Sequence, residues 1–151
     1  MAARLGRLLA LGRDEGGASV IEFALFAPIL AVMVMGVSDL SMGYSRKLTL
    51  ESAAFRSLEK VAVGSVQTDY QFLKAEAAAG AGVPQSNVTV DNWLECDRVR
   101  QTDFTGTCPT GQMTSRYVQV TINSTYTPRF NYGPLGGSPV PISASAALRI
   151  Q

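Results

Sequence analysis

One apolar stretch near the N-terminus constrains this chain more than any other feature. It runs from Arg13 to Val37, opens with charge, passes Gly16-Gly17 and then stays apolar. The apolar part holds about twenty residues, which as a helix cover the roughly 30 Å hydrocarbon core of a bilayer. Glu22 is an acid inside this run. A carboxylate there costs a few kcal/mol, so we expect it to have a role.

The basic residues around the start of the stretch predict the topology. Arginines lie close before the apolar run, and the positive-inside rule keeps that end in the cytoplasm. The bulk of the chain then lies on the far side, which is the periplasm for a bacterial-type inner membrane. In that oxidising compartment, Cys96 and Cys108 are expected to pair into a disulfide.

Composition argues against several function classes. The net charge of +1 over 151 residues gives no basic surface for nucleic acid. The chain has no His, and its two Cys are too few for a thiolate zinc site. No nucleophile stands out beside a base. We therefore expect no enzymatic activity, no catalytic residues, no metal and no cofactor.

Two ordinary interpretations of the apolar stretch remain open. A secretory signal peptide would be cut before Asp39, with Gly36 and Ser38 as the small residues of the site. A plain uncleaved anchor would let Glu22 snorkel to the lipid headgroups.

A third interpretation places the cut on the cytoplasmic side, after Gly17. The mature chain then begins at Ala18, with Glu22 and Phe23 following, and this pattern resembles the prepilin processing site of bacterial pilins. Cleavage creates an α-amino group on Ala18, about one helical turn from the Glu22 carboxylate. In a stack of such helices, that carboxylate can meet the amine of a neighbour, so Glu22 sets the register of assembly. Pro28 predicts a kink in the same helix.

The segment EGGASVIEFALFAPILAVMVMGVSDL looks like the opening of the TadE-like family, which comprises minor pilins or pseudopilins of tight-adherence (Tad/Flp) type IV pilus systems. The resemblance rests on the run Val20 to Leu25, on Pro28, and on Gly36 followed by Asp39. It departs from the family pattern in Ile21, which stands between Val20 and Glu22. The resemblance implies a prepilin peptidase, other pilin or pseudopilin subunits and an inner-membrane assembly platform as partners, besides the membrane lipid.

Past the membrane, the same helix is predicted to continue from about Ser19 to Val63, ending at Gly64-Ser65. Its apolar residues recur with a helical period, so one stripe can face its own domain while another can be offered to neighbours. The periodic residues are Leu40, Tyr44, Leu48, Phe55, Leu58 and Ala62.

The remaining chain predicts a short helix and a small sheet. A helix is expected within 68–84, capped by Thr68 or Asp69 and stopped by Gly80, Gly82 and Pro84. Strands are expected at 87–96, 116–127 and 141–150, the last two antiparallel, with a polar loop between the cysteines. Trp93 is expected to be a packing residue.

These elements predict an α+β, pilin-like fold, with a long N-terminal helix packed on an antiparallel sheet of three or four strands. The expected division is a cytoplasmic leader at 1–17, the transmembrane and assembly half of the helix at 18–37, and a periplasmic domain at 38–151. The leading hypothesis is a minor pilin or pseudopilin of a tight-adherence pilus, acting in pilus assembly and adhesion. The alternative is a secreted or membrane-anchored periplasmic binding domain with an ordinary signal peptide or anchor.

Overall fold

A computed structural model describes residues 16–62, 69–130 and 137–150, and it describes side chains from residue 20 onward. The chain divides into two compact units, Met1–Leu40 and Ser41–Gln151, which are described separately. One helix, α2 (Gly16–Ala62), contributes to both units. Its bounds agree with the predicted helix, whereas the predicted stop at Gly64-Ser65 lies outside the described residues.

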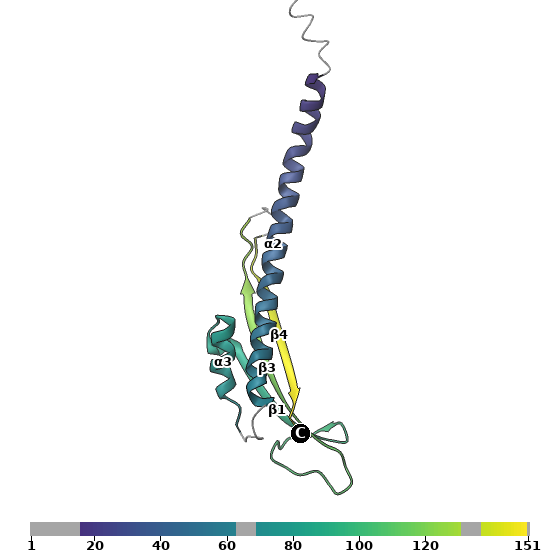
Figure 1. Cartoon of the computed structure of the whole chain (residues 1–151), viewed down its shortest axis with the longest axis vertical. Helices are drawn as coiled ribbons and strands as arrows, with labels where there is room; N and C mark the ends of the chain where they lie inside the picture. Colours follow the sequence, from purple (N-terminus) through teal and green to yellow (C-terminus); the bar gives the residue numbers. More distant parts are fainter. Residues whose placement is uncertain (1–15, 63–68, 131–136, 151) are drawn as a thin grey trace, which may run out of the picture. The chain divides into compact units, whose positions relative to one another are not determined.

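The second unit contains a four-stranded antiparallel sheet in the order β2-β1-β3-β4 (Figure 1). The strands are β1 (Val88–Cys96), β2 (Val99–Arg100), β3 (Thr114–Tyr126) and β4 (Val140–Arg149). The predicted pairing of the last two strands is confirmed, with Val120 opposite Ala146. Strand β2 was not predicted, because the sequence between the cysteines reads as a polar loop.

The short helix α3 (Phe72–Ala81) confirms the prediction within 68–84. It ends at Gly82, which has φ 61°, a left-handed conformation that glycine adopts without strain. Its start differs from the predicted cap at Asp69, and the alternative cap, Thr68, lies outside the described residues. Residue Gln71 precedes the helix, and the Asp69 carboxylate accepts a hydrogen bond from the Gln71 backbone N–H at 2.8 Å.

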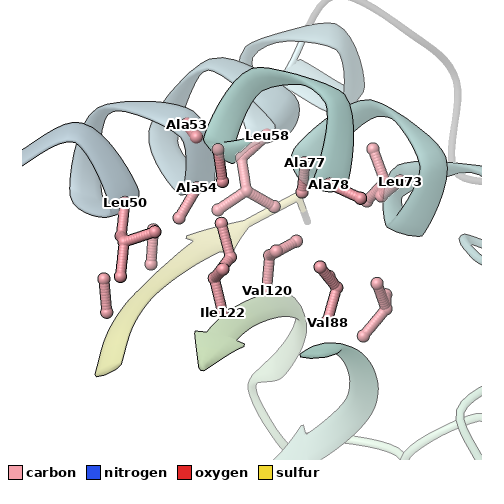
Figure 2. Packing of buried hydrophobic residues seen from close by; sticks show 14 of the residues in the cluster. Leu50, Ala53, Ala54, Leu58, Leu73, Ala77, Ala78, Val88, Val120 and Ile122 are labelled. Atoms are coloured by element: carbon pink, nitrogen blue, oxygen red, sulfur yellow. The ribbon is translucent and has the colours of Figure 1, made fainter. Parts of the chain in front are cut away.

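The core lies between one face of the sheet and the two helices (Figure 2). Alternate strand residues point into it, because side chains of a strand alternate between its faces. Val90, Val120 and Ala146 form one row across three strands. Helix α3 supplies Leu73, Ala77, Ala78 and Ala81, and α2 supplies Leu50, Ala53, Ala54, Leu58 and Val61.

Small residues let the two helices of this unit approach closely. A Cβ added to Gly80 in α3 would lie 3.4 Å from the Cβ of Ala53 in α2. A larger side chain at either position would push the helices apart and open the core.

The apolar stripe read from the sequence is mostly not the buried one. Within the second unit, Tyr44, Leu48 and Phe55 are exposed, and Leu58 alone of the larger periodic residues is buried. The buried face of α2 instead carries Leu50, small alanines and Ser57, whose hydroxyl donates to the Ala54 carbonyl. The α2 stripe is thus left uncovered by the described residues. The fold class, α+β, is as predicted.

Candidate assembly site on the N-terminal helix

The first unit presents an exposed apolar helix. Phe23, Leu25, Phe26 and Val32 are each more than half exposed, and they lie on different sides of α2. By length and composition this helix could cross a membrane, and none of its most apolar window is buried. A signal sequence near an N-terminus has the same length and apolar composition. The site of proteolytic processing therefore distinguishes a membrane anchor from a signal sequence.

The residues assigned to cleavage and assembly lie at the start of this helix. Gly17 and Ala18 are in the first turn of α2, and Glu22 and Phe23 follow one turn later with exposed side chains. Within the described part of the chain, no salt bridge is formed with Glu22. A partner for this carboxylate would have to come from elsewhere, and the roles of these four residues stay predictions.

Two further positions of the same segment have different outcomes. The helix continues through Pro28, so the predicted kink stays a prediction. Asp39, which marks the family motif and the alternative signal-peptidase cut, is 6% exposed. Sequence reasoning missed that burial, because nothing in the local sequence signals it.

The predicted disulfide between Cys96 and Cys108 is present, with its Cα atoms 5.5 Å apart. It joins the end of β1 to the loop that follows β2. Arg116 braces the same loop, since its guanidinium donates to the backbone carbonyls of Phe104 at 3.1 Å and Gly106 at 2.8 Å. The loop is thus held at several points.

Asp103 organises the middle of that loop. Its carboxylate accepts hydrogen bonds from the Thr105 hydroxyl at 2.7 Å and the Thr105 backbone N–H at 2.9 Å. The side-chain bond and then the backbone bond hold the pKa of Asp103 below its ordinary value, because both stabilise the charged carboxylate.

The sheet face away from the core carries a row of aromatic and charged side chains. The rings of Trp93 and Tyr117 stack at 5.3 Å, and the Arg100 guanidinium lies 4.6 Å from the Trp93 ring on the neighbouring strand. Arg100 also pairs with Asp91 at 2.7 Å, and Trp93 donates its indole N–H to Glu95 at 2.8 Å. Both faces of the indole are therefore occupied, and Trp93 is a packing residue that ties the β1–β2 hairpin together.

An open groove separates α2 from α3 in the second unit. Short polar side chains line much of it, including Ser45, Thr49 and Ser52. An ion pair between Lys60 and Glu76, 2.6 Å apart, bridges the two helices at its side. In the part of the chain that the structure describes, no group of three His, Cys, Asp or Glu residues could hold a metal ion.

An exposed apolar helix is followed by a small α+β unit, in which the same helix packs on an antiparallel sheet, and this is the layout expected for a pilin-like fold. The family model described as TadE-like protein matches residues 17–57, which confirms the resemblance over that segment. The match begins at Gly17 and covers most of α2. Over that segment the chain is similar to a family of Tad pilus-associated proteins. Comparison with curated proteins and with solved structures gave no match.

Proposed function

We propose that this chain is a minor pilin or pseudopilin of a tight-adherence pilus, cleaved by a prepilin peptidase after Gly17 and taking part in pilus assembly and adhesion. The observation that carries the proposal is the TadE-like match, which begins at Gly17 and lies on an exposed apolar helix. The leader is then 1–17, the membrane and assembly half of the helix is 18–37, and the periplasmic domain is 38–151.

The proposed mechanism uses charge pairing in the membrane. Before cleavage, Glu22 is an acid in an apolar helix without a salt bridge in the described chain. Cleavage frees the Ala18 amine, and a neighbouring subunit's Glu22 offsets its burial. The peptidase, the other pilin-like subunits and the inner-membrane platform are the partners in this scheme. The N-terminus stays cytoplasmic until processing, and the domain lies in the periplasm.

The test is the intact mass and N-terminal sequence of the protein from native membranes. We expect a start at Ala18 that reverts to the full-length chain in Gly17→Leu. The matched control is Gly36→Leu, because a side chain at Gly36 meets nothing within 4 Å, whereas a signal-peptidase cut before Asp39 depends on a small residue there.

Assembly is tested separately, by the recovery of the cleaved protein with pilus components. Glu22→Ala should leave the start at Ala18 and strongly reduce recovery of the protein with pilus components, while Glu59→Ala, an exposed acid of the same helix, should not. A native start at Asp39 would establish the secreted domain and remove the pilin proposal. A native start at Met1 would leave an anchored protein.

A further inference from the structure

A stripe on the second unit's part of α2 is apolar and uncovered. Tyr44, Leu48 and Phe55 are 63%, 45% and 59% exposed. Their spacing of four and seven residues places them on one face of the helix. The core of this unit uses a different face of α2, centred on Leu50 and Ala54. Within the described residues, the stripe is therefore not part of the hydrophobic core. Two of its three residues are aromatic.

Charges of both signs border this stripe. Lys47 and Glu51 are one turn apart, and their charged atoms are 3.9 Å apart within the chain. Their side chains are 49% and 39% exposed. An exposed pair at this separation contributes little to its own helix, and both groups keep room for a second partner.

We infer that a second copy of this chain packs in parallel along the stripe, displaced by one helical turn so that Lys47 of one copy pairs with Glu51 of the other. The inference rests on the proposed function, since copies anchored in one membrane have parallel helices. A displacement of four residues corresponds to about 6 Å along the helix axis. It also places Tyr44 of one copy opposite Leu48 of the other.

Charge complementarity selects this displacement. Two copies in register place Glu51 against Glu51 and Lys47 against Lys47, and both contacts are repulsive. A shift of one turn converts them into an attractive Lys47–Glu51 contact. The same shift brings the Ala18 amine of one copy level with Glu22 of the next, because these two residues have the same spacing in the sequence. One displacement thus satisfies both pairs of charges.

The test is cross-linking between differently tagged full-length copies in native membranes. Copies with Ser41→Cys are expressed together with copies with Ser45→Cys and treated with a short bismaleimide, so that the Lys47 and Glu51 charges stay in place. Both serines are exposed on α2 and four residues apart. The native cysteines are in a disulfide and do not react. We expect the mixed pair to cross-link about five times more than either single variant with itself, since the register brings only the mixed positions together. Equal yields, a higher yield of either variant with itself, or no cross-link would overturn the inference.

Charge reversal gives a second arm. Lys47→Glu and Glu51→Lys should each reduce cross-linking between the Ser41→Cys and Ser45→Cys copies by about fivefold. The double reversal should restore it, because the contact is then again between opposite charges. A double reversal as weak as the single ones would overturn the register.

Phe55→Ser should also reduce the yield, whereas Phe72→Ser, at an exposed aromatic of α3 outside the stripe, should leave it unchanged. Equal losses in both would overturn the role of the stripe. The N-terminus of the protein distinguishes failure of the register from failure of the proposed function. A chain that begins at Ala18 but gives no mixed cross-link would contradict the register alone. A chain that begins at Asp39 would contradict the proposed function on which the register rests.

Discussion

At the scale of single residues, the fold holds the Asp103 carboxylate in its ionised form. Thr105 donates two hydrogen bonds to it, and the pKa of Asp103 is lowered from its ordinary value of 3.8. A depressed folded-state pKa contributes stability above 3.8 that is lost as the pH falls through the folded value. In Thr105→Val the hydroxyl bond is absent and the backbone bond remains. We expect the Asp103 titration, followed by NMR, to move up toward 3.8 in this variant, and an unchanged titration would contradict the assignment of the hydroxyl as the main cause.

At the scale of elements, α2 divides its apolar residues between a core face and an uncovered face. Leu50 is fully buried, whereas Leu48, two positions earlier, is 45% exposed. Leu50→Ala should lower the free energy of unfolding by about 2–5 kcal/mol, because it leaves a cavity in the core. Leu48→Ala should change it by at most about 0.5 kcal/mol. Urea unfolding of the protein in detergent measures both, and a similar loss in the two variants would mean that Leu48 packs inside the unit.

The same two leucines show what the sequence can and cannot predict. The helix, its length and the alternating strands follow from local periodicity, as for Val118, Val120 and Ile122 in β3. The buried face of α2 could not be predicted in this way, because the core face relies on alanines, which give a weak hydropathy signal. One of them, Ala53, packs closely against Gly80 of α3, and only the folded structure shows that contact.

The β1–β2 hairpin and the burial of Asp39 lay beyond sequence reasoning for different reasons. Asp97 and Arg98 both adopt positive φ, of 51° and 68°, in the turn before β2. This conformation favours Asn and Gly, so Asp-Arg gives no turn signal, and tertiary contacts such as the Arg100–Asp91 pair stabilise it instead. Motif reasoning used Asp39 as part of the family pattern and carried no information about its surroundings. The candidate residues Gly17, Ala18, Glu22 and Phe23 came from the sequence alone, and their roles depend on a partner.

At the scale of the whole molecule, the disulfide stabilises the fold, and its oxidation state reports the compartment in which the domain lies. Opening the Cys96–Cys108 link frees a loop whose closure contributes about 3 kcal/mol by loop-length arithmetic. Reduction should therefore lower the urea midpoint, and the Cys96→Ser/Cys108→Ser double variant should match the reduced protein with no further response to reductant. Protein taken from native membranes should react with a thiol reagent only after reduction. Immediate reaction would place the domain in a reducing compartment and contradict a periplasmic location.

The core joins the first described element of the chain to the last. Leu50 and Ala54 of α2 share one cluster with Ala144 and Ala146 of β4, the final strand. A ribosome makes the helix before this strand, so the chain cannot complete the burial of the helix's core face until Val140–Arg149 has been made. During that interval both faces of α2 beyond the apolar segment are open to solvent. A chain that stops before Val140 would keep the core face open permanently, which makes incomplete copies both sticky and recognisable to quality-control proteases.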